Sequence, residues 1–206
     1  MTSPTALYLD TFYHIFNRGN NRENIFIEDP NFQFFMQLYS KYIPPIADTM
    51  AYCLLRNHFH LFVRIKPAAE ILDSLDMCAT DKNRLLHSPS RQFSNFFNAY
   101  TKVINHTYHR TGSLFQHPFK RIPVFDELHV CRLITYIHQN PQRHGFVNDF
   151  REWPYSSYHA QCSNEETSLT GGVVPRFFHD PKEYLKAHSR KLDMDSIKPL
   201  LIDDIS

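Results

Sequence analysis

Two histidines separated by one residue are the first feature of this chain with a recognisable chemistry. His58 and His60 flank Phe59 in an apolar run that continues to Val63. On a β-strand alternate side chains share a face, so the two imidazoles stand side by side and Phe59 points into the opposite layer. Such a pair, about 6–7 Å apart along the strand, can bind one divalent cation. With 13 histidines in the chain, the same spacing also arises from surface or packing chemistry, and both interpretations stay open.

A tyrosine and an asparagine further along the chain could complete such a site. Tyr136 and Asn140 are four residues apart, so on a helix they share one face, with Cβ atoms about 5–6 Å apart. A helix packed beside the histidine strand would bring a phenol and an amide oxygen up to the imidazoles. Taken singly, Tyr136 is also an ordinary residue of an amphipathic helix, and Asn140, before Pro141, also fits a helix end.

Composition limits the class of protein. A chain of 206 residues, 42% hydrophobic and 21% charged, predicts one large globular domain or one domain with extensions. It shows no N-terminal apolar segment and no long uncharged apolar stretch, so we expect neither a signal peptide nor a membrane span. The four cysteines form no Cys-x-x-Cys pair, which argues against a zinc ribbon and favours reduced thiols in the cytoplasm.

Charge is distributed unevenly although the net charge is only +1. No Asp or Glu occurs from Lys82 to Val124. This stretch contains seven basic residues: Lys82, Arg84, Arg91, Lys102, Arg110, Lys120 and Arg121. The pattern predicts a phosphate-binding surface, but a solvated helix face of chance composition would look the same.

Hydrophobic periodicity, caps and turn residues predict seven secondary-structure elements. In order they are a strand over 10–17, a helix from 29 to before 44, strands over 50–55 and 58–65, a helix over 89–109, a strand over 119–125, and a helix from 126 to 140. The order β-α-β-β-α-β predicts an α+β, ferredoxin-like sandwich. The added C-terminal helix would carry Tyr136.

Four segments together resemble a known family. They are Tyr-His-Ile-Phe-Asn-Arg-Gly-Asn-Asn-Arg (13–22), Tyr-Cys-Leu-Leu-Arg-Asn-His-Phe-His-Leu-Phe-Val (52–63), Tyr-Ile-His-Gln-Asn-Pro-Gln-Arg-His-Gly (136–145) and Trp-Pro-Tyr-Ser-Ser-Tyr (153–158). In this order they resemble the single-tyrosine HUH transposases, and within these the REP-associated tyrosine transposases. The resemblance covers residues 8–160, which predicts a catalytic domain there and an appendage of unclear role over 161–206.

The resemblance implies a role for each candidate residue. His58 and His60 would be the metal ligands of the HUH motif, Asn140 the third ligand, and Tyr136 the nucleophile. A glutamine typically takes the place of Asn140 in mobile-element relatives, so the asparagine itself points to the REP-associated branch. The resemblance also supports a DNA groove lined by Arg18, Asn20, Asn21 and Arg22, although any polar turn would have a similar composition.

The chemistry explains why these residue types are needed. A phenol has a pKa near 10, so it attacks phosphorus at neutral pH only when its oxygen is well placed and its charge is stabilised. A divalent metal on a phosphate oxygen supplies that stabilisation. Attack would leave a 5′-phosphotyrosine and a free 3′-hydroxyl, with no nucleotide cofactor. A neutral ligand set of two imidazoles and an amide suits Mg²⁺ or Mn²⁺, and the imidazoles favour Mn²⁺.

The sequence therefore predicts a metal-dependent endonuclease and strand transferase that acts on single-stranded DNA beside a hairpin, as a monomer or homodimer. One alternative is a domesticated, non-catalytic protein that binds nucleic-acid hairpins. A pure binding protein would need neither the histidine pair nor Tyr136 and Asn140 at this spacing. A metal-dependent hydrolase without a covalent intermediate is a second alternative, which the lack of nearby carboxylates disfavours.

Overall fold

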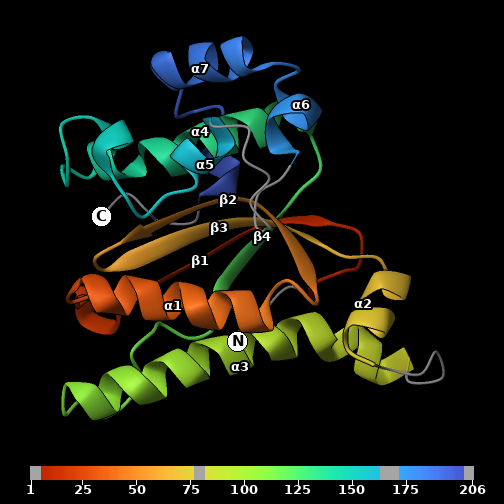
Figure 1. Cartoon of the computed structure of the whole chain (residues 1–206), viewed down its shortest axis with the longest axis vertical. Coiled ribbons are helices and arrows are strands. Elements are labelled where there is room, and N and C mark those ends of the chain that lie inside the picture. Colours follow the sequence, from red (N-terminus) through yellow and green to blue (C-terminus); the bar gives the residue numbers. More distant parts are fainter. Residues whose placement is uncertain (1–5, 77–81, 163–171, 202–206) are drawn as a thin grey trace.

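A four-stranded antiparallel sheet forms the centre of the protein, described here from a computed structural model (Figure 1). The structure describes residues 6–76, 82–162 and 172–201, so Cys78 lies outside it. The strands are β1 (Phe12–Arg18), β2 (Ala47–Leu55), β3 (His58–Ile65) and β4 (Lys120–Val124). They lie in the order β2-β3-β1-β4, and each neighbouring pair is antiparallel. The predicted antiparallel sheet with flanking helices is confirmed.

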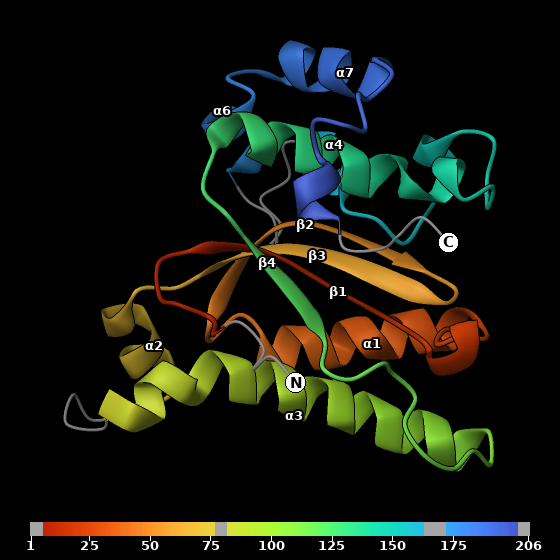
Figure 2. The same cartoon turned by 180° about the vertical axis from the view of Figure 1, so that it is seen from behind.

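Helices cover both faces of this sheet (Figures 1 and 2). The α-helices are α1 (Asp29–Tyr42), α2 (Ala68–Ser74), α3 (Lys82–Thr107), α4 (Glu127–Arg143), α5 (Tyr158–Cys162), α6 (Val173–Phe177) and α7 (Pro181–Ser189). Short 3-10 helices are η1 (Asn20–Arg22), η2 (Phe150–Glu152) and η3 (Lys198–Leu200). The helices α1 and α3 lie against one face, whereas α4 and the later helices lie over the other.

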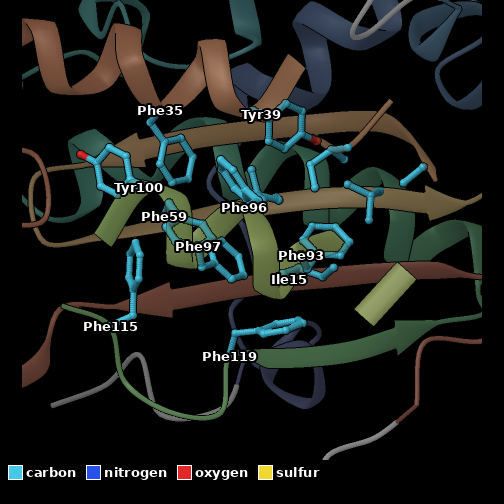
Figure 3. Close-up of a cluster of buried hydrophobic side chains, with 14 of the residues drawn as sticks. Ile15, Phe35, Tyr39, Phe59, Phe93, Phe96, Phe97, Tyr100, Phe115 and Phe119 are labelled. Atoms are coloured by element: carbon cyan, nitrogen blue, oxygen red, sulfur yellow. The ribbon is translucent and has the colours of Figure 1, made fainter. Parts of the chain in front are cut away.

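Alternation along β3 separates two buried clusters, as the sequence predicts. Phe59 points toward α1 and α3, where its ring lies 5.3 Å from Phe35, 5.4 Å from Phe97 and 5.9 Å from Phe115 (Figure 3). Phe62, two residues beyond His60, packs instead in the cluster beneath α4. The histidine pair therefore faces α4, and the aromatic core on the other side of the sheet fixes the strand that carries it.

Two prolines that the sequence places at helix boundaries lie inside helices. Pro89 cannot donate to the carbonyl of Leu85, but the hydroxyl of Ser88 donates to that oxygen at 2.8 Å. Because this carbonyl keeps a partner, α3 begins at Lys82 and not near residue 89 as predicted.

The predicted end of α4 at Pro141 is also wrong. The helix continues to Arg143, and Gly145, two residues beyond it, reverses the chain with a φ of 71°. The amide of Phe146 then donates to the carbonyl of Pro141 at 2.9 Å, which closes the helix end. Asn140 therefore lies within the last turns of a helix.

The segment after residue 171 packs on the same face as α4. Val173, Phe178, Tyr184, Ile197 and Leu200 are buried in one cluster with the apolar side of α4. The boundary predicted at residue 160 between a catalytic domain and an appendage stays a prediction. In the described part of the chain, no helix is both long enough and apolar enough to cross a membrane.

A chain of buried histidines joins α7 to α4 and β2. The carbonyl of Tyr184 accepts a hydrogen bond from His188 Nδ1 at 2.8 Å, so His188 Nε2 accepts from His138 Nδ1 at 2.9 Å. His138 Nε2 then accepts from the hydroxyl of Ser157 at 2.8 Å. Burial lowers the pKa of His188 to about 4 and holds that of His138 well below its usual value. Both rings are therefore neutral in the folded protein.

We predict that acid weakens the fold through His188. Below about pH 6.5 the unfolded chain binds a proton at this residue, and the folded chain does so only near pH 4. The contribution of His188 to the free energy of unfolding is complete above this pH window. It falls within the window, and about 3 kcal/mol of it is lost at pH 4. Urea unfolding at several pH values, compared with His188→Gln, measures the effect. The glutamine variant should lose less stability on acidification, and equal losses would contradict the assignment.

Candidate active site

The strand β3 and the helix α4 bring the four predicted catalytic residues together. The rings of His58 and His60 have centroids 5.2 Å apart, and the ring of Tyr136 lies 5.6 Å from that of His60. The ring centroid of His144, the residue that follows α4, lies 4.8 Å from that of His58. Asn140 is one turn from each of Tyr136 and His144, so it faces the histidine pair between them.

All four residues are deeply buried. The exposed fraction is 3% for His58, 2% for Tyr136 and zero for His60 and Asn140. The amide nitrogen of Asn140 donates to the carbonyl of Tyr136 at 3.2 Å. Its Oδ1 is buried, with no hydrogen-bond partner among the residues that the structure describes. A buried amide oxygen in that position is a suitable ligand for a hard cation.

Hydrogen bonds fix which nitrogen of each histidine carries the proton. His58 Nδ1 lies 2.7 Å from Asn57 Oδ1, an acceptor, so the proton is on Nδ1 and Nε2 has the lone pair. His60 Nδ1 lies 3.0 Å from Nε2 of His14 on β1. Burial, together with His14, His144 and Arg18, holds the pKa of His60 well below its usual value. A neutral imidazole is the form that binds metal.

These donors fit a divalent cation held weakly by the protein itself. They comprise two imidazoles and one amide oxygen, with no carboxylate to neutralise the charge of the ion. Accordingly, no group of three or more His, Cys, Asp or Glu residues suited to a metal occurs in the described ranges. Mg²⁺ and Mn²⁺ both accept such a site when water and phosphate oxygens complete the coordination.

Three neighbours of the site were not predicted from the sequence. His14 contacts His60, His144 contacts His58, and the guanidinium of Arg143 lies 5.7 Å from the ring centre of Tyr136. The contact of His144 could have been predicted from the sequence, because Tyr136, Asn140 and His144 follow one another at intervals of four residues. His14 needed the strand pairing of β1 with β3, which no local pattern specifies.

Some of the residues predicted to bind DNA lie beside the site. Arg18 is directly opposite His58 across β1 and β3, so the two share a face. Lys120 is opposite Phe16, whose ring stacks 5.9 Å from His60, which places Lys120 on the same face at the sheet edge. Asn20, Asn21 and Arg22 follow β1 in η1. Asn20 donates to the carbonyl of Ser113, while Asn21 and Arg22 are exposed.

The other predicted DNA-binding residues lie away from the site. Arg91 and Lys102 are exposed on α3, across the sheet from α4 (Figures 1 and 2). Arg110 pairs with Glu23 at 2.6 Å. Arg121 lies 3.7 Å over the ring of Phe119 and donates to Ser90. The acid-free stretch is therefore divided between two faces, and its DNA binding stays a prediction.

A groove of about 930 Å³ lies on the outer side of α4. It does not include the histidine pair or Tyr136, but Arg143 lines it. Its other basic residues are Arg151 on η2, Lys186 on α7, and Arg190 and Lys191 just after α7, and its acidic one is Asp149. Residues 185–192, which belong to the segment of unclear role, line one part of this surface, and residues 139–158 line the rest.

Comparison with known proteins points to one group. A Haemophilus influenzae protein, provisionally named a REP-associated tyrosine transposase, is 27% identical over 119 residues, or 57% of this chain. A solved REP-associated tyrosine transposase bound to a REP hairpin has the same fold, with a TM-score of 0.53 and 15% identity. That match covers 84% of this chain and 93% of the other. The chain resembles the REP-associated tyrosine transposases.

The resemblance to these transposases is partial in extent. The aligned region spans 62% of the length of the Haemophilus relative. No model of a protein family matches the sequence. The match to the solved transposase shows that this chain has a similar fold. The hairpin in that structure is a ligand of the solved protein.

Proposed function

We propose that this protein is a metal-dependent nuclease and strand transferase of the REP-associated tyrosine transposase type, acting on single-stranded DNA next to a hairpin in the cytoplasm. The convergence of Tyr136, Asn140, His58 and His60 between α4 and β3 carries the proposal. The strand order and the two helices on one face also support a ferredoxin-like assignment of the fold. The hairpin bound by the similar solved transposase supports a hairpin beside the cleaved strand.

In this proposal each residue of the site has a separate role. Tyr136 attacks phosphorus and becomes linked to the 5′ side of the break, while the 3′ oxygen leaves with a proton as a hydroxyl. His58, His60 and Asn140 would hold a divalent cation, which would stabilise the charge that develops on the phosphate. The guanidinium of Arg143, 5.7 Å from the ring centre of Tyr136, places a positive charge beside the attacking group. Because Tyr136 is only 2% exposed, neighbouring groups must move before a phosphate reaches its oxygen.

Rejoining reverses the same step. A free 3′-hydroxyl attacks the phosphotyrosine, the P–O bond to Tyr136 breaks, and the phenol regains a proton. The number of phosphodiester bonds is conserved, so no nucleotide is consumed.

A direct assay tests the proposal. The protein is incubated with labelled single-stranded DNA from the flanks of its own gene, containing a hairpin, and with Mn²⁺. We expect a labelled, protein-linked species that resists denaturation and disappears on nuclease or protease treatment. Tight hairpin binding without any covalent species would favour the non-catalytic alternative.

Substrate form gives a second prediction. A stacked duplex restricts in-line approach to a backbone phosphate, so single strands should be cut and perfect duplex should not. Phosphate contacts should make binding weaker as salt rises, by about 0.7 log units per log of salt for each contact on a single strand. Matched single-strand, duplex and hairpin-plus-tail oligonucleotides compare these forms. Equal cutting of duplex, or affinity that ignores salt, would contradict the prediction.

A further inference from the structure

The carbonyl of Leu200 and the ring of His14 form a directed hydrogen-bond chain to His60. His14 Nδ1 lies 2.8 Å from the oxygen of Leu200, and His14 Nε2 lies 3.0 Å from His60 Nδ1. Both rings are fully buried, their centroids lie 5.2 Å apart and their planes are inclined by 20° to each other. The chain thus joins η3, near the C-terminus, to β1 and β3.

The direction of this chain follows from the chemistry of its first member. A carbonyl oxygen only accepts, so His14 must carry its proton on Nδ1. A neutral His14 then has a lone pair on Nε2, which accepts from His60 Nδ1. His60 is left with its lone pair on Nε2, the nitrogen that faces away from His14. The same tautomer is imposed on His58 by Asn57.

We propose that His14 is a positioning residue that holds His60 in its metal-binding tautomer. The backbone carbonyl of Leu200, in turn, sets the tautomer of His14. The inference rests on the proposed metal site but concerns residues outside it. Partners on the second nitrogen of a metal-bound histidine orient the ring and raise its basicity. Here Leu200 acts through His14 on His60, which lies 140 positions earlier in the sequence, and so helps to set the state of one proposed metal ligand.

Two measurements on the full chain test the proposal. Long-range ¹H–¹⁵N spectra of the metal-free protein should show His14 and His60 both protonated at Nδ1. Titration with Mn²⁺, followed by electron paramagnetic resonance, should show about 10–100-fold weaker binding in His14→Leu. His14→Gln, whose amide oxygen can accept near the position of Nε2, should recover most of the affinity.

The outcomes separate this inference from the proposed function. Protonation of His60 at Nε2 in the parent protein overturns the inference, even if His14→Leu fails to fold. Unchanged Mn²⁺ affinity in a folded His14→Leu variant also overturns it. If the parent protein binds Mn²⁺ no better than His58→Ala does, the proposed metal site is wrong. The spectra would still show whether His14 and His60 have the tautomers inferred here.

The groove outside α4 carries a second, independent inference. Five of its lining residues are basic, against one acid, Asp149, which is already paired with Arg151 at 2.6 Å. Lys186 is paired with Glu183. Arg143 both lines the groove and lies 5.7 Å from the ring centre of Tyr136, so this one residue is shared between the groove and the surroundings of the candidate active site.

We infer that this groove binds the phosphate backbone of single-stranded DNA flanking the cleaved bond, given the proposed function. A strand attached at Tyr136 would pass Arg143 and then meet Arg190 and Lys191, which are exposed. Arginine and lysine heads spaced along a groove neutralise successive phosphates without reading the bases. The surface thus adds affinity on the side of the sheet opposite α3.

Binding of a labelled single strand at several salt concentrations tests this inference. The double variant Arg190→Ala with Lys191→Ala should lose about 1.4 from the salt slope and bind about 25-fold more weakly at 0.1 M salt. The matched control, Lys41→Ala with Lys182→Ala, removes the same charge from outside the groove and should change little. An unchanged slope, or an equal loss in the control, overturns the inference alone. If the parent protein binds no single-stranded DNA at all, both this inference and the proposed function are overturned.

Discussion

Replacing Tyr136 with phenylalanine should abolish the covalent protein–DNA species while leaving the fold and DNA binding nearly unchanged. The substitution removes one hydroxyl from a ring that remains packed against His60, so the buried cluster keeps its shape. Without the phenolic oxygen no phosphotyrosine can form. Denaturing gels with labelled single-stranded DNA measure the adduct, and anisotropy measures binding. We expect adduct below detection and affinity within a few-fold of the parent.

Tyr108→Phe is the matched control. Its hydroxyl bonds to Glu28 on the other side of the sheet, and its loss should leave adduct formation intact. Tyr100 is no more suited to attack, because its hydroxyl donates to the carbonyl of Ile25 and burial raises its pKa. A Tyr136→Phe protein that still forms adduct would show that the nucleophile is assigned wrongly.

Removing either histidine of the pair should eliminate metal-dependent cleavage. His58→Ala and His60→Ala each delete one of the three proposed protein donors, and the proposed site has no carboxylate to compensate. Since loss of a mere supporting partner of a ligand costs about 10–100-fold, loss of the ligand should exceed that range. EDTA should have the same effect on the parent protein. Cleavage rates at a series of Mn²⁺ concentrations, with and without chelator, provide the measurement.

His106→Ala, at an exposed position of α3, is the control for loss of a histidine as such. Because His60 is fully buried, thermal unfolding must accompany its kinetics, and the chelator result does not depend on any substitution. Full cleavage in EDTA would return both histidines to a packing role and show that cleavage by this protein needs no divalent metal.

The sequence alone determined the local features of this site. Strand periodicity predicted that His58 and His60 share a face and that Phe59 enters the opposite core, and helix periodicity predicted a shared face for Tyr136 and Asn140. The predicted boundaries of the two long helices were wrong where proline was taken as a helix boundary, Pro89 as a start and Pro141 as an end. Ser88 satisfies the carbonyl that Pro89 leaves, and Gly145, four residues after Pro141, ends α4.

The tertiary structure decided every relation that spans the sheet. It placed Arg91 and Lys102 on the face opposite Tyr136, dividing a basic stretch that looks continuous in the sequence. It also brought His14 and Leu200 to His60, and residues after α7 to the outer side of α4. Periodicity reports only which side of its own element a residue occupies. Which elements that side meets depends on strand order and packing over the whole buried core.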